Sequence, residues 1–142
     1  MVEINVKDVE IGASYEGEIY DFWVKGELVS GQLIKIFDCI PFNLSNCVGK
    51  SLDVLLLAGF IKLGIKREET HKTTISGNFI REYEIPRNIV KIRKDVYQKK
   101  WFGFQNNDGI FLLDPAEFEN IDLKYGEGVS INVGRFDLIG IV

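Results

Sequence analysis

The 142-residue chain contains one histidine, and this scarcity excludes most of the commonest catalytic arrangements. A histidine base, a His–Cys pair or a multi-histidine metal site has only His71 available for its central residue. His71 stands in a charged stretch beside Glu68, Glu69 and Lys72, which is typical of a solvated surface imidazole. We therefore expect a protein that is not an enzyme, in which His71→Ala leaves function unchanged.

Cysteine is nearly as scarce, with only Cys39 and Cys47. The two do not form a C-x-x-C pair, and no histidine lies near them in sequence, so they supply at most half of a zinc site. Free thiols are expected in a cytosolic chain, and a disulfide between the two is the alternative. No metal site is predicted.

Long apolar runs are absent as well. The longest, from Val54 to Ile61, is interrupted by Gly59 and is far too short to span a bilayer. The first twelve residues lack the basic start and the sustained apolar segment of a secretory signal. These features predict a cytoplasmic protein without a membrane partner.

Two glycine motifs resemble nucleotide-binding loops only in part. Gly49–Lys50–Ser51 ends like a phosphate-binding loop, but Leu44 stands where the first glycine of that loop is required. Gly126–Glu127–Gly128 begins like a dinucleotide fingerprint, but Ile131 occupies the position of its third glycine. We therefore predict no cofactor.

What the chain does contain is alternation of apolar and polar residues, punctuated by glycine. Hydrophobic residues make up 46% and charged residues 27%, which fits one ordinary globular domain over residues 1–142. The pattern predicts a mainly β protein, a small antiparallel barrel or partly open barrel that is OB-like by fold-level analogy. The expected strands are Tyr15–Val24, Leu33–Ile40, Leu52–Ile61, Thr73–Ile75 with Phe79–Ile85, Ile89–Lys94, Gln98–Phe104, Ile110–Leu113 and Val129–Phe136. The apolar run within Ser51–Phe60 also fits a buried helix.

Local signals predict one tight turn, one short helix and one long connection. The residues from Phe104 to Ile110 include Asn, Asp and Gly, which tolerate the positive φ of a hairpin turn. A helix is expected at Pro115–Asn120, capped by Asp114, with Glu117 as capping-box partner and Phe118 as core anchor. The polar stretch Leu63–Asn78 is expected to be a long exposed hairpin connection.

Positive charge and aromatic rings gather in one stretch of this acidic chain, whose formal net charge is −4. Between Arg81 and Phe104 seven basic residues outnumber three acidic ones. A strand period of two predicts one core face there, made of Val90, Ile92, Val96, Phe102 and Phe104. The opposite, solvent-facing side is predicted to carry Lys91, Arg93, Tyr97, Lys99 and Trp101. Asp95 interrupts this stripe.

Two functions fit these observations. The first is a non-catalytic protein-binding module, such as an accessory subunit, an inhibitor or an immunity-type protein. The alternative is a single-stranded nucleic-acid-binding domain that stacks bases on Tyr97 and Trp101 and holds phosphates with its lysines and Arg93. A structural explanation competes with both, because lysine and arginine commonly keep an exposed strand soluble. If the face is functional, Trp101→Ala is expected to weaken binding and to leave stability nearly unchanged.

Overall fold

A computed structural model describes residues 1–63 and 73–142 and shows a mainly β protein, 59% strand and 9% helical. The strands are β1 (Val2–Ile11), β2 (Ser14–Tyr15), β3 (Glu18–Ile19), β4 (Phe22–Leu28), β5 (Leu33–Asp38), β6 (Ser51–Leu63), β7 (Thr73–Tyr83), β8 (Lys91–Ile92), β9 (Trp101–Asn106), β10 (Gly109–Leu113) and β11 (Gly128–Ile141). The helical segments are short 3-10 turns: η1 (Ser45–Cys47), η2 (Lys94–Gln98) and η3 (Pro115–Phe118). Across the described ranges, no helix has the length and apolar character needed to cross a membrane.

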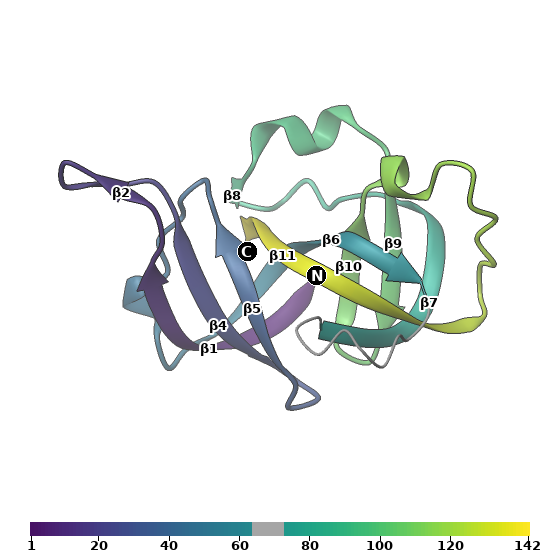
Figure 1. The fold of residues 1–142 in the computed structure, drawn as a ribbon, viewed down its shortest axis with the longest axis horizontal. Coiled ribbons are helices and arrows are strands. Elements are labelled where there is room, and N and C mark those ends of the chain that lie inside the picture. The colour runs from purple at the N-terminus through teal and green to yellow at the C-terminus, as the bar shows by residue number, and fades with distance from the viewer. Residues whose placement is uncertain (64–72) are drawn as a thin grey trace.

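The strands close into two rings that share β6 and β11 (Figure 1). In the first ring the neighbours are β1, β4, β5, β11 and β6, and a parallel contact between β5 and β11 completes the circle. In the second ring they are β6, β10, β9, β7 and β11, with a parallel contact between β6 and β10. The predicted fold class is confirmed as a mostly antiparallel ring of strands, although the rings do not form a regular barrel.

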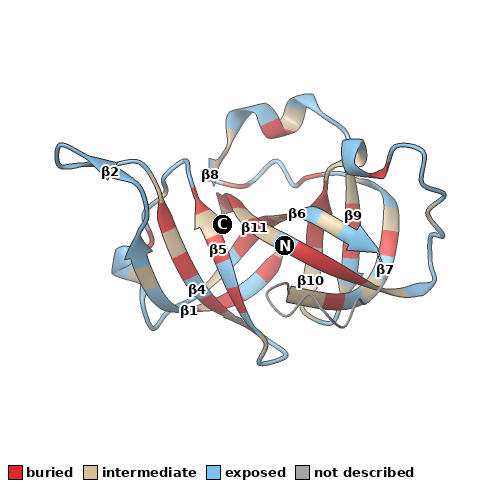
Figure 2. Ribbon diagram, viewed as in Figure 1, coloured by how far each residue is buried: buried red, intermediate tan, exposed pale blue. Residues whose placement is uncertain are grey.

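The membership of β6 and β11 in both rings explains their sequences. In β6, the consecutive residues Val54, Leu55 and Leu56 are fully buried. In β11, Leu138 and Ile139 are each only 1% exposed. A strand covered on both faces reads as a continuous apolar run and shows no alternation. The run that fitted either a strand or a buried helix is therefore a strand, and its pattern reflects burial between the two core clusters; Figure 2 marks buried residues in red.

Several predicted elements are confirmed. Strands at Leu33–Ile40, Leu52–Ile61, Ile110–Leu113 and Val129–Phe136 correspond to β5, β6, β10 and β11. The predicted hairpin joins β9 to β10, with Asn106 opposite Gly109 at its end. The predicted helix is the short turn η3, in which the Asp114 side chain accepts a hydrogen bond from the Ala116 N–H and Phe118 is buried. Glu117 does not close a capping box, because its carboxylate accepts the Ile61 N–H instead.

The N-terminal quarter differs from the prediction. Strand β1 was not predicted, and the expected strand Tyr15–Val24 is interrupted by a turn. Glu16 and Gly17 both have positive φ, +49° and +81°, as a tight hairpin turn requires. The stretch therefore forms a small hairpin, β2–β3, followed by the separate strand β4.

The predicted connection Leu63–Asn78 is partly wrong. Residues 64–72, which include His71, lie outside the described residues. The flanking strands β6 and β7 lie on opposite sides of β11, where Ile131 is paired with both Leu63 and Ile75. Strands β6 and β7 both pair with β11, on its opposite edges, so they are not the two paired strands of a hairpin.

Candidate functional site

The predicted basic and aromatic face is not a continuous strand. Strand β8 covers only Lys91–Ile92, and the 3-10 turn η2 follows at Lys94–Gln98 before β9 begins at Trp101. A 3-10 turn advances about three residues per turn, so it destroys the period of two on which the prediction rested. Val90, predicted in the core, is 85% exposed, whereas Val96 and Phe104 are buried as predicted.

The structure differs most clearly from the prediction at Trp101. This residue is only 4% exposed and packs in a second apolar cluster with Ile85, Ile89 and Val96. Its indole N–H donates to the Val96 carbonyl oxygen at 2.8 Å, which satisfies its one polar group. The prediction of a solvent-facing Trp101 is therefore wrong, and the ring cannot serve as an open stacking platform.

The other four predicted residues are exposed or partly buried, but several are already engaged. The Arg93 guanidinium lies 2.6 Å from the Asp95 carboxylate, and Lys99 is paired with Asp114. The Tyr97 hydroxyl donates to the Pro86 carbonyl at 2.8 Å. Lys91 is exposed on β8. A role for these residues in binding stays a prediction, without the shared strand face that motivated it.

Tyr97, Lys99 and Trp101 do border a common cavity of about 330 Å³. Glu82 and Glu84 contribute acidic side chains to the same walls, and Arg87 and Lys100 contribute basic ones. Beside this cavity, partial burial raises the pKa of Asp114, but hydrogen bonds from Lys99 and the Ala116 N–H and the charges of Lys99 and Arg93 outweigh burial. The net result is a pKa below the ordinary aspartate value, as expected for a carboxylate that is paired with a lysine.

A different set of rings and cations lies on the outward side of β4 and β5. In β4, Phe22, Val24, Gly26 and Leu28 point into the first ring, and the residues between them face outward. In β5, Ile34, Ile36 and Asp38 are buried in the same way. Antiparallel register then places Trp23 opposite Phe37 and Lys25 opposite Lys35.

These side chains extend into a row that crosses four strands. Lys35 Nζ lies 4.7 Å from the centre of the Trp23 ring, and the Trp23 and Phe37 rings are 4.7 Å apart. The Arg135 guanidinium lies 4.8 Å from the Phe37 ring and 5.1 Å from the Phe60 ring. We call this set the aromatic–cationic row; it consists of Lys35, Trp23, Phe37, Arg135 and Phe60. Its contacts come from β5, β4, β11 and β6.

Arg135 holds the middle of the row in a fixed geometry. Its Nε lies 2.7 Å from one Asp137 carboxylate oxygen, and its Nη2 donates to the other at 3.2 Å. One hydrogen bond and one ion-pair contact to the same carboxylate hold the guanidinium in place, although Nε and Oδ1 themselves are buried without a hydrogen-bond partner. The stacking of Arg135 on Phe37 and Phe60 is therefore preorganised.

Phe60 ends the row in a costly conformation. Its φ is +53°, a left-handed value that is a true outlier for a bulky residue, and its side chain is 62% exposed. Gly134 leaves the room for it, since a Cβ at residue 134 would lie 2.6 Å from the Phe60 Cβ. Neither burial nor backbone preference accounts for an exposed phenylalanine here. Strain of this kind concentrates at functional sites.

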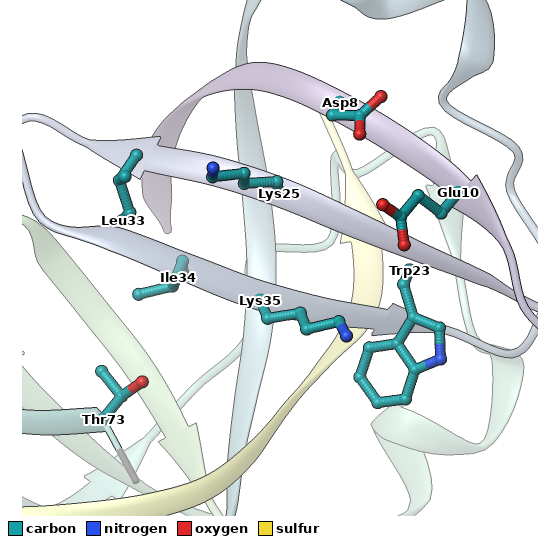
Figure 3. A pocket seen from close by; sticks show the side chains of 8 residues that line it. All are labelled: Asp8, Glu10, Trp23, Lys25, Leu33, Ile34, Lys35 and Thr73. Carbon is teal, nitrogen blue, oxygen red and sulfur yellow. The ribbon is translucent and has the colours of Figure 1, made fainter. Parts of the chain in front are cut away.

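A groove of about 400 Å³ runs alongside the row (Figure 3). Figure 3 shows the Lys35 side chain extending toward the Trp23 ring, and Glu10 lies on the neighbouring strand β1, where it is paired with Trp23. The groove is lined by Asp8, Glu10, Trp23, Lys25, Leu33, Ile34, Lys35 and Thr73. Among the described residues of the row and groove, the cations Lys25, Lys35 and Arg135 are equal in number to the carboxylates Asp8, Glu10 and Asp137. The surface is thus aromatic and charged but balanced.

The arrangement is suited to binding. Within the described ranges, no group of three or more His, Cys, Asp or Glu side chains is placed to hold a metal ion. Asp38, which is fully buried, uses its two oxygens to accept the N–H groups of Phe42 and Asn43. Comparison with protein-family models, curated proteins and solved structures gave no match.

The row went unrecognised in the sequence although a signal for it exists. The segments FWVKGEL and LIKIFD each alternate cleanly, and each places an aromatic residue and a lysine on its outward side. Arg135 lies on β11, which pairs with β5, and Phe60 lies on β6, which pairs with β11. Both pairings join strands that are far apart in the sequence. Local alternation therefore predicts three of the five residues of the row, and the other two depend on tertiary structure.

Proposed function

We propose that this chain is a non-catalytic protein-binding module, an accessory, inhibitor or immunity-type protein of the cytoplasm, that recognises its partner through the aromatic–cationic row. The observation that carries the proposal is the surface row in which the Trp23 ring makes a tilted contact with Phe37 and the Arg135 guanidinium lies over the Phe37 and Phe60 rings. Trp and Arg are the residues most enriched among binding hot spots, and rigid aromatic anchors lose little entropy on binding. Cys39 and Cys47 are both free thiols, which supports a reducing compartment.

The charge of this surface favours a protein partner over nucleic acid. Grooves that follow a nucleic-acid backbone carry a clear excess of positive charge. Here three cations and three carboxylates stand among the described residues of the row and groove and beside Arg135, and the whole chain carries −4. A mixed-charge rim around aromatic anchors is typical of protein interfaces.

One observation supports the alternative, a single-stranded nucleic-acid-binding domain. Numbered in chain order, the strands of the first ring are adjacent in the order 1-2-3-5-4-1, with strands 3 and 5 parallel. An OB barrel has this order, and it binds oligonucleotides on the face of strands 2 and 3. Those strands correspond to β4 and β5, which carry Trp23 and Phe37. Fold analogy alone does not establish function, so this remains the second candidate.

The proposal is tested by quantitative capture from a lysate of the source cells with three immobilised proteins. These are the wild type, the row variant Trp23→Ala and the control Val90→Ala, whose side chain is exposed and is not part of the row. We expect a protein that the wild type and the control retain equally, and whose affinity for Trp23→Ala, measured by calorimetry after purification, is lower by about 1–3 kcal/mol. The proposal is wrong if every captured protein binds Trp23→Ala as tightly as the wild type.

A parallel titration with a fluorescent oligothymidylate tests the alternative. Row-dependent binding of the oligonucleotide, with log affinity falling by about 0.7 per phosphate contact for each unit of log salt, would favour the nucleic-acid function. If the protein-binding proposal is right, we expect no saturable oligonucleotide binding at physiological salt.

A further inference from the structure

The hairpin β2–β3 extends away from the first ring as an arm (Figure 1). We use the name arm for residues 10–21. Its base continues the pairing of β1 with β4, in which Glu10 lies opposite Trp23 and Ile11 opposite Phe22. The Gly12 N–H donates to the Asp21 carbonyl at 3.0 Å, and the Ala13 N–H donates to the Asp21 carboxylate at 2.7 Å. The arm is therefore an ordered extension of the strands that carry part of the row.

Beyond its paired base the arm projects into solvent. The eleven residues from Glu10 to Tyr20 are all exposed. They include four large hydrophobic side chains, of which Tyr15 is 66% and Ile11 is 59% exposed, with Ile19 and Tyr20 exposed as well. An isolated two-stranded hairpin is only marginally stable in water, and exposing such side chains on one adds no folding energy. Exposed apolar side chains grouped in this way mark an interaction site.

Charge indicates the kind of surface that the arm fits. The arm carries Glu10, Glu16, Glu18 and Asp21 and no lysine or arginine, which gives it a formal charge of −4. This equals the net charge of the whole chain, so the remaining residues sum to zero. Complementary potentials select partners and speed association.

We propose that the arm inserts into a basic cleft of the protein partner, with Tyr15 and Tyr20 as apolar anchors and the carboxylates facing lysine or arginine side chains of the cleft. This inference rests on the proposed protein-binding function and assigns a second contact to the same interface. The fixed hairpin conformation lowers the entropy lost on insertion. The chain would thereby reach a recessed surface of the partner while the row contacts the rim around it.

The first experiment is photo-crosslinking in a lysate of the source cells. The full chain carries the photoreactive amino acid p-benzoylphenylalanine in place of Tyr15 or, as a control, in place of Val90. We expect one protein to be crosslinked from residue 15 and not from residue 90, and its labelled peptide to lie in a cleft lined by lysine and arginine. Crosslinking to a second copy of this chain, to a neutral or acidic surface, or to no protein would overturn the proposal.

The second experiment measures binding of the crosslinked protein to an arm-shortened variant, in which residues 13–20 are replaced by Asn-Gly. None of the replaced residues is buried, so we expect the thermal midpoint to change by no more than about 2 °C. Affinity is expected to fall at least about 100-fold. The milder pair Glu16→Gln and Glu18→Gln should lower the association rate about tenfold at low salt, and much less at high salt.

These variants separate the arm from the row. If Trp23→Ala weakens binding and the shortened arm does not, the proposed function stands and the inference about the arm is wrong. If the shortened arm weakens binding and Trp23→Ala does not, the arm is an interface and the row is not. Loss of binding in both variants, with the fold intact, supports the two contacts together.

Discussion

At the scale of single residues, the two tryptophans occupy opposite environments. Trp101 is buried and hydrogen-bonded within an apolar cluster, whereas Trp23 is half-buried on the outward side of β4, in tilted contact with the Phe37 ring. Both stand beside lysine in space, since Lys99 lies 4.9 Å from the Trp101 ring and Lys35 lies 4.7 Å from the Trp23 ring. A basic neighbour thus does not distinguish a core tryptophan from a surface one. The arrangement of the backbone does.

Alanine substitution should separate the two roles. Trp101→Ala is expected to lower the free energy of unfolding by about 3–5 kcal/mol, because it leaves a large cavity in the core. Trp23→Ala should lower it by about 1 kcal/mol, the value of a surface ring pair. Urea denaturation with unchanged m-values measures both. Equal losses in the two variants would contradict the assignment.

Phe60 offers a test of whether strain is retained for binding. Asparagine tolerates a positive φ better than phenylalanine, so Phe60→Asn relieves strain while removing the ring from Arg135. We expect the free energy of unfolding to be unchanged or up to about 1 kcal/mol higher, and partner affinity to fall about tenfold. A variant that is clearly less stable and binds normally would show that Phe60 serves the fold.

The space around Phe60 gives a further stability prediction. Gly134→Ala places a Cβ 2.6 Å from the Phe60 Cβ and should destabilise the protein by about 1–3 kcal/mol. Gly128→Ala, in the same strand, is the matched control, since its Cβ would meet nothing within 4 Å. Thermal unfolding of the two variants should differ clearly. Similar midpoints would mean that β11 adjusts easily beside Phe60.

Asp114 makes stability depend on pH. Its pKa in the folded protein is lowered from the ordinary 3.8, so its contribution is fully present above that value and is lost as pH falls through the lower folded pKa. The stability difference between wild type and Asp114→Asn should therefore be constant near neutrality and shrink below about pH 4. Urea unfolding across this range measures it. A difference that does not change with pH would rule out the Lys99–Asp114 pair as its source.

At the scale of elements, prediction succeeded where a strand has one buried face or clear turn residues. Strand β5, the β9–β10 hairpin and the Asp114–Pro115 helix start were all predictable from local pattern. It failed between Ile89 and Phe104, where η2 interrupts the chain. A 3-10 turn of five residues leaves no pattern that distinguishes it from a short strand. The row was missed because Arg135 reaches Phe37 through the parallel contact of β5 with β11, which no local rule indicates.

Two turns that are distant in sequence are tied together. The Asp108 carboxylate accepts the Ser30 N–H at 2.7 Å and the Ser30 hydroxyl at 2.8 Å, which joins the β4–β5 turn to the β9–β10 turn. Asp108→Ala should cost about 1–2 kcal/mol of unfolding free energy, because both bonds are lost. The exposed neighbour Asn107→Ala is the control. If both variants have wild-type stability, this contact does not hold the turns together.

At the scale of the whole molecule, the two rings share β6 and β11, and the larger of the two core clusters spans both rings, while a smaller cluster contains Trp101 and Leu55. One continuous cluster includes Ile36 of the first ring and Phe104 of the second. Loss of either ring removes a wall of the other. The molecule is therefore expected to unfold as one cooperative unit, although its strands form two circles.

The two tryptophans allow this to be measured, because one lies in each ring. Trp101→Phe leaves Trp23 as the only tryptophan, and Trp23→Phe leaves Trp101. Within each variant, the urea transitions followed by tryptophan emission and by far-ultraviolet dichroism should coincide. A transition of one ring well before the dichroism change would show that the rings fold independently.

The most direct test of the central claim, that the aromatic–cationic row is the surface that meets the partner, is acrylamide quenching of Trp23 emission in the Trp101→Phe protein. Trp23 is partly exposed in the free chain, so free acrylamide should quench it readily. With saturating amounts of the partner identified by capture, the account predicts that the quenching constant falls several-fold, as expected when a hot-spot ring is shielded from solvent. An unchanged quenching constant in the fully bound complex would contradict it.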